Sequence, residues 1–158
     1  MFTSLYKLTD DFKLKWLQLQ IFHRILPTAR LLHLYGVTDT DACTFCKTQV
    51  ETITHLFWHC RKVNAFWRDV TASLMSSHAI SLVQVVMNTS LPGRDDSMQL
   101  LIILLGKQYI WRSRCLERRL SVNEFKQCVK AYYDIELFIA RANDQVTRLN
   151  EMWKCVFC

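Results

Sequence analysis

Four potential metal ligands in residues 43–60 constrain this chain more than any other feature. They are Cys43, Cys46, His55 and Cys60, in the pattern Cys-x2-Cys-x8-His-x4-Cys. A tight turn directs both sulfurs of a Cys-x2-Cys pair inward, and a histidine and a cysteine about one helical turn apart can complete a tetrahedron. Four protein ligands leave no coordination position for water, which is typical of a structural zinc. The sequence therefore predicts one structural Zn²⁺ ion held by these four residues.

Other interpretations of this segment stay open at the level of sequence. His59 lies four residues after His55, but it is adjacent to Cys60, and neighbours on a helix point about 100° apart. We therefore prefer His55 with Cys60 over a set that uses His59. The alternative to metal binding is that Cys43 and Cys46 are buried apolar thiols and that His55 is packed in the core. Glu51 is the nearest carboxylate, and it is not placed beside the ligands as a general base would be.

Composition favours a mostly helical fold, because 3 glycines and 2 prolines are too few for the turns of a many-stranded protein. Apolar residues at steps of three and four predict a helix over residues 12–26, with an apolar face of Phe12, Trp16, Leu19, Phe22 and Leu26. Pro27 ends this helix, and a short helix follows up to Leu34, with Gly36 as its left-handed terminator. Residues 37–49 lose the helical period and predict a loop or tight hairpin.

Helical spacing returns in residues 53–75, which predict one long helix or two in series. Residues 80–87 are too short to assign as helix or strand. A break at residues 91–95 separates a predicted zinc-binding helical domain, residues 1–90, from a C-terminal helical hairpin, residues 91–158, which packs on it. The hairpin consists of a basic helix over residues 97–120 and a last helix that begins at Ser121, with Glu124 in a capping box, and runs towards Trp153.

The order of these residues resembles a known family, the reverse-transcriptase zinc-binding domain near the C-terminus of LINE-type retrotransposon polyproteins, the class without long terminal repeats. The resemblance covers about residues 12–75 and rests on aromatic, helix-ending and ligand positions: Trp16, Phe22, His23, Arg24, Ile25, Leu26, Pro27, Thr28, Leu31, Gly36, Cys43, Phe45, Cys46, Glu51, Thr52, His55, Leu56, Phe57, Trp58, Cys60, Phe66 and Trp67. The segment from Gly106 to Arg112, with Phe125 and its helix, is similar to the end of such polyproteins. The family's four zinc ligands correspond to Cys43, Cys46, His55 and Cys60.

The resemblance implies an accessory module that binds RNA or single-stranded DNA, and the net charge of +6 favours anionic partners. The endonuclease and polymerase parts of the family are missing, so we expect no enzyme activity. Candidate stacking rings are Phe45, Phe57, Trp58 and Trp67, but rings at helical spacing are more often core residues than stacking platforms. Candidate phosphate contacts are Arg30, Lys47, Arg61, Lys62, Arg68, Lys107, Arg112 and Arg114.

A second hypothesis is a zinc-stapled structural or protein-interaction module that docks on the rest of a retrotransposon polyprotein or on another copy of the chain. Salt dependence distinguishes the two hypotheses, because phosphate contacts weaken steeply with salt and apolar docking does not. The apolar run at residues 100–105 is far shorter than the roughly 20 residues of a membrane span, and residues 1–11 do not resemble a secretory signal. We therefore expect a nuclear or cytoplasmic protein without a membrane or small-molecule partner.

Overall fold

A computed structural model describes residues 8–75, 80–89 and 97–157 of the chain. The predicted break at residues 91–95, and with it the domain boundary between residues 90 and 91, lies outside these residues. The described part is helical, which confirms the predicted fold class, and its β-structure is one isolated antiparallel bridge between Ala42 and Val50. Its helices are α2 (Phe12–Phe22), α3 (Ala29–Leu34), a π-helical turn η1 (His55–His59), α4 (Arg61–Leu74), α5 (Leu82–Met87), α6 (Ser97–Cys115), α7 (Val122–Ala142) and α8 (Val146–Phe157).

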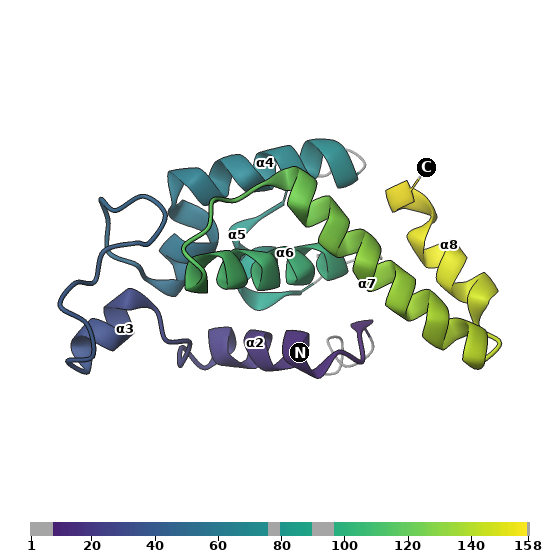
Figure 1. Ribbon diagram of the computed structural model, residues 1–158, viewed down its shortest axis with the longest axis horizontal. Helices are drawn as coiled ribbons and strands as arrows, with labels where there is room; N and C mark the ends of the chain where they lie inside the picture. The colour runs from purple at the N-terminus through teal and green to yellow at the C-terminus, as the bar shows by residue number, and fades with distance from the viewer. Residues whose placement is uncertain (1–7, 76–79, 90–96, 158) are drawn as a thin grey trace.

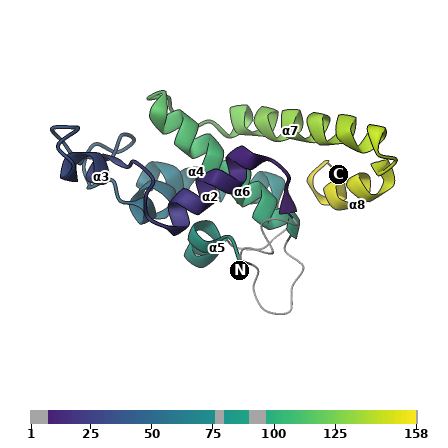
Figure 2. The ribbon, with the colours of Figure 1, turned by 90° about the horizontal axis from the view of Figure 1, so that it is seen from below.

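The centre of the molecule is α6, which has α4 on one side and α2 on the other (Figure 1). Its first half is apolar all round, and residues 100–104 are all buried, as expected for a helix surrounded by others. The short helix α5 also packs on α6 and α2. The first part of α7 contacts α4 and α6, its second part extends past the body, and α8 folds back along it (Figure 2).

The predicted apolar face of α2 is wrong. The helix buries Leu14, Leu17 and Ile21, whereas Phe12 is 72% exposed and Trp16 is 46% exposed. The reason is that α2 carries two apolar stripes, and spacing alone does not say which one meets α6. The helix also ends at Phe22, earlier than predicted, because Arg24 adopts a left-handed conformation (φ 58°) that reverses the chain.

The other predicted helices agree more closely with the structure. Residues 53–75 form two helical segments in series, and Gly36 is left-handed (φ 69°), as expected. Residues 82–87, which the sequence left open, are helical. Ser121 caps α7 by accepting a hydrogen bond from the Glu124 amide. The predicted last helix is two helices, because the chain turns at Asn143 to Gln145 before α8 begins.

Gly106 allows α6 and α4 to approach closely. A Cβ atom at this position would overlap the outer ring of the Trp67 indole. The Trp67 indole nitrogen donates a 2.8 Å hydrogen bond to the carbonyl of Phe57 in η1. Trp67 therefore connects the central helix to the π-helical turn.

We expect the substitution Gly106→Ala to destabilise the protein. The added methyl group must displace the Trp67 ring, and this overpacking outweighs the gain in helix propensity of about 1 kcal/mol, for a net loss of about 1–2 kcal/mol. Chemical denaturation of the zinc-loaded protein measures the difference. A variant as stable as the wild type would show that the Trp67 ring has room to move.

Candidate metal centre

The first two ligands lie on a tight turn closed by the bridge between Ala42 and Val50. Within it, the Cys43 amide donates a 2.8 Å hydrogen bond to the Gln49 carbonyl, and the Lys47 amide donates one of 2.8 Å to the Cys43 carbonyl. Lys47 has a φ of 57°, a conformation that favours glycine. The turn therefore fixes both sulfurs on the same side, as the Cys-x2-Cys spacing predicted.

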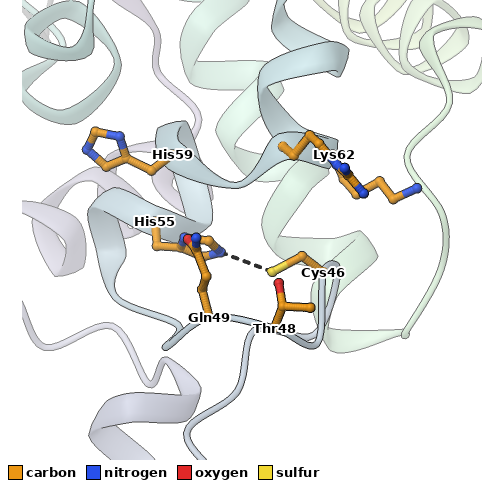
Figure 3. A pocket seen from close by; sticks show the side chains of 7 residues that line it. Cys46, Thr48, Gln49, His55, His59 and Lys62 are labelled. Atoms are coloured by element: carbon orange, nitrogen blue, oxygen red, sulfur yellow. Dashed lines mark hydrogen bonds between the residues drawn. The ribbon is translucent and has the colours of Figure 1, made fainter.

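The other two ligands are aligned by the π-helical turn. Such a turn joins residues five apart, and the Cys60 amide donates a 2.9 Å hydrogen bond to the His55 carbonyl. Cys60 is therefore one full turn after His55. His59 is exposed, and its ring points away from Cys46, whereas the ring of His55 points towards it (Figure 3).

The four ligand atoms form a compact group in which every pair lies within 4.8 Å. The sulfurs of Cys43 and Cys60 are 3.9 Å apart, and the Cys46 sulfur is 3.4 Å from Nε2 of His55. A tetrahedral zinc with ordinary bond lengths requires about 3.8 Å between two sulfurs and about 3.6 Å between sulfur and nitrogen. The residues therefore fit one zinc ion, and the closed set of four makes it structural.

At Cys60 and Cys46, local hydrogen bonds favour the thiolate form that a metal requires. The hydrogen bond with Cys43 lowers the pKa of Cys60 to about 5, with further help from the amides of Val63 and Lys62. The same hydrogen bond, together with burial, raises the pKa of Cys43, because the two sulfurs share one proton. Zinc would replace this proton.

The Cys46 thiol has its own set of donors. Burial raises its pKa, but hydrogen bonds from the Thr48 side chain, from the amides of Thr48 and Gln49, and from His55 outweigh that effect and lower it to about 7. Amides of the turn therefore point at the sulfur. The backbone of the turn supplies donors that stabilise a charged sulfur at Cys46.

Glu51 connects the metal loop to the helical body. Its carboxylate is fully buried. Oε1 accepts hydrogen bonds from the Ala29 amide at 2.8 Å and from Nε and Nη2 of Arg114 at 3.0 and 2.9 Å. Oε2 accepts one of 2.9 Å from the Thr44 amide in the turn. One side chain thus joins the start of α3, the metal-binding turn and the end of α6.

This role for Glu51 is not predicted from the sequence, which identifies the residue only as the carboxylate nearest the ligands. The signal that points to burial is its position: Glu51 lies between the two ligand pairs and two residues before the apolar start of a helix. Nothing in the sequence shows that Arg114, 63 residues away, is its partner.

The predicted phosphate contacts differ in their exposure to solvent. Six are exposed: Arg30, Lys47, Arg61, Lys62, Arg68 and Arg112. Arg114 is mostly buried and paired with Glu51, and its guanidinium lies over the Trp111 ring at 5.1 Å. Its assignment to phosphate is therefore wrong.

Lys107 is also wrong as a phosphate contact, because its side chain is fully buried. Its ammonium donates hydrogen bonds to Oε1 of Gln18 and, at 3.1 Å, to Oδ1 of Asn88. Burial lowers the pKa of Lys107 well below its ordinary value. The residue joins α2, α5 and α6 inside the core and has no access to a nucleic acid.

A cavity of about 310 Å³ lies beside the ligands (Figure 3). Cys46 and His55 form part of its wall. The remaining lining is polar or basic and contains no carboxylate: Thr48, Gln49, His59, Arg61 and Lys62. The arrangement suits an anionic group next to the metal centre.

Comparison with known proteins agrees with the geometry of the ligands. Residues 1–67 match a protein family described as zinc-binding in reverse transcriptase. The match includes the four predicted ligands, and for this part of the chain it confirms the resemblance to a reverse-transcriptase zinc-binding domain. No curated protein and no solved structure matches the chain.

The two histidines provide a matched test of the ligand set. We expect His55→Ala to lose the bound zinc and several kcal/mol of folding free energy, because a structural zinc site contributes directly to folding. We expect His59→Ala to keep one zinc per chain and the wild-type melting temperature. Elemental analysis and thermal unfolding measure both quantities. Zinc retained in His55→Ala and lost in His59→Ala would reverse the assignment.

A second test concerns Glu51. The substitution Glu51→Gln keeps the size of the side chain but removes the charge opposite Arg114, and we expect a loss of about 3 kcal/mol in the free energy of unfolding. Chemical denaturation with zinc in excess isolates this effect from metal loss. The exposed Glu151→Gln variant on α8 serves as the control and should match the wild type. Equal stability of both variants would contradict the role given to Glu51.

Proposed function

We propose that this chain is an accessory nucleic-acid-binding module, for RNA or single-stranded DNA, in which zinc fixes the binding surface. The observation that carries the proposal is the basic cavity beside the metal centre. Two of its lining residues, Arg61 and Lys62, follow the ligand Cys60 directly, so the metal determines where they lie. Their side chains are exposed and able to reach phosphate groups.

Helix stability does not explain why cations occupy these positions. Arg61 and Lys62 occupy the first turn of α4, where the helix dipole disfavours positive charge. Lys47 likewise occupies a left-handed position at which glycine is the favoured residue. Three cations close to the ligands therefore stand at positions where local structure prefers other residues, which supports a binding role.

The aromatic rings near the metal support the proposal less than the cations do. Phe57 and Trp67 are buried, so they are core residues and not stacking platforms. Phe45 and Trp58 are half-buried. Phosphate contacts are therefore the main contribution that we propose, with stacking limited to Phe45 and Trp58.

The second hypothesis, docking of a protein, is supported by a different surface. A cavity of about 720 Å³ lies between α2, α3 and α5, and its lining combines Arg24, Arg30 and three threonines with apolar side chains that include Ile21, Leu31, Leu34 and Val86. Leu34 is 74% exposed. Such a surface suits apolar contact with the rest of a larger protein.

The proposed module has no catalytic activity of its own and acts in the nucleus or cytoplasm, next to other domains of a retrotransposon-type protein. Its membership of a LINE-type element rests on the sequence resemblance. No helix within the described residues is long and apolar enough to cross a membrane.

Binding to RNA and to single-stranded DNA should depend on the cations at the metal site. We expect Lys47→Gly, Arg61→Ala and Lys62→Ala each to weaken binding and to reduce the slope of log K against log salt by about 0.7, the value for one phosphate contact on a single strand. Of the three variants, Lys47→Gly is the most specific test of a phosphate contact. Glycine suits the left-handed backbone at this position, so the turn and the zinc should be retained.

Fluorescence anisotropy with labelled oligonucleotides over a series of salt concentrations measures these slopes. Lys154→Ala, which removes an exposed cation from α8, is the control and should bind as the wild type does. Zinc content is measured on every variant. Equal losses in the control and the three test variants would indicate attraction by net charge alone, and no binding by the wild type would leave the protein-docking hypothesis.

A further inference from the structure

The helix α7 has two apolar faces, of which the described structure covers one. The covered face contains Phe125, Val129 and Ala140, which are buried against the body and α8. The second face is exposed to solvent and carries Cys128, Ala131, Ile135, Phe138 and Ala142. In the view of Figure 2, α6 and α8 lie on one side of α7, and no described segment covers the other.

These five residues follow a strict pattern, whereas Ile139, which is 48% exposed, lies off it and lines a pocket with residues of α8. Their spacing alternates between three and four residues over two heptads, which is the a/d spacing of a coiled-coil seam. The two largest side chains lie at its centre, where Ile135 is 61% exposed and Phe138 is 76% exposed. A surface helix of a monomer needs one apolar stripe, and this second stripe is the kind that pairs with another helix.

The charges beside the stripe indicate which helix fits. Asp134 and Arg141 both precede an a position, on the same edge of the stripe, and both are exposed. Neither belongs to an ion pair among the described residues. In an antiparallel pair of identical helices, residues on this edge face each other across the two-fold axis.

The pairing that places Ile135 of one copy against Phe138 of the other also places Ala131 against Ala142. In the same register Asp134 of one copy faces Arg141 of the other, twice by symmetry. A shift of one heptad in one direction brings Asp134 against Asp134, and a shift in the other direction brings Arg141 against Arg141. A parallel pair brings neither charge against its opposite. The sequence of α7 is therefore complementary to itself in one arrangement.

We propose that the exposed stripe of α7 is a homodimer interface, in which two copies of this chain pair antiparallel through Ile135 and Phe138 with Asp134–Arg141 ion pairs at the edge. The paired segment, residues 128–142, is about 22 Å long. An interface of this length is smaller than that of a typical stable complex, so the dimer forms in a concentration-dependent manner. The proposal goes beyond nucleic-acid binding and is independent of it.

A charge-exchange experiment tests the arrangement on the full chain without nucleic acid. Asp134→Arg and Arg141→Asp each turn both edge pairs into repulsive ones, so each variant alone should dimerise at least about tenfold more weakly than the wild type at low salt. In an equimolar mixture, both edge pairs of the heterodimer are attractive again, and the dimer should return. Sedimentation velocity over a concentration series measures the dissociation constants, with circular dichroism and zinc content as checks of folding.

A second pair of variants tests the apolar seam. Phe138→Glu should abolish the dimer, whereas Lys130→Glu, an exposed change on the same helix but off the stripe, should leave it intact. The proposal is overturned by a wild-type protein that stays monomeric at all concentrations, by a dimer that survives Phe138→Glu, or by a mixture of the charge variants that dimerises no better than each variant alone.

Discussion

The contact between Glu51 and Arg114 holds the metal loop to the rest of the molecule. The segment between α3 and η1 is almost entirely without helix and buries few apolar side chains, so the hydrophobic core alone does not determine its position. A buried carboxylate must satisfy its oxygens, and Glu51 does so with donors from α3, the metal-binding turn and α6 at once. Because Arg114 is itself mostly buried, neither charge has an alternative partner in water.

Trp67 provides a second connection between the metal centre and the core. Its ring fits against Gly106 in α6, and its indole nitrogen satisfies a carbonyl of the π-helical turn that carries His55. The zinc site is therefore continuous with the packing of α4 on α6. Loss of the metal would free both the turn and the ring that depends on it.

The sequence predicted which four side chains come together at the metal centre, because ligand spacing is a local property. It also predicted most helices, since their caps are local: Gly36 and Ser121 act as expected, whereas α2 ends at Phe22, before the predicted stop at Pro27. The larger errors concern contacts between distant segments. The buried face of α2 depends on α6, and the burial of Lys107 depends on Gln18 and Asn88, which come from helices far apart in the chain. A lysine in a basic run is ordinarily exposed, and only the assembled core shows otherwise.

The π-helical turn fixes more than the position of one ligand. Each residue of a helix rotates the following side chains by about 100°, so the number of residues between His55 and Cys60 also sets the rotation of α4 relative to the metal. With the present number, Val63, Phe66 and Val70 face the core while Cys60 faces His55. Deletion of one residue from this turn would require either the ligand or the whole apolar face of α4 to turn away. The number of residues between His55 and Cys60 therefore determines both the coordination of the metal and the packing of α4 in the core, and it cannot change for one without changing the other.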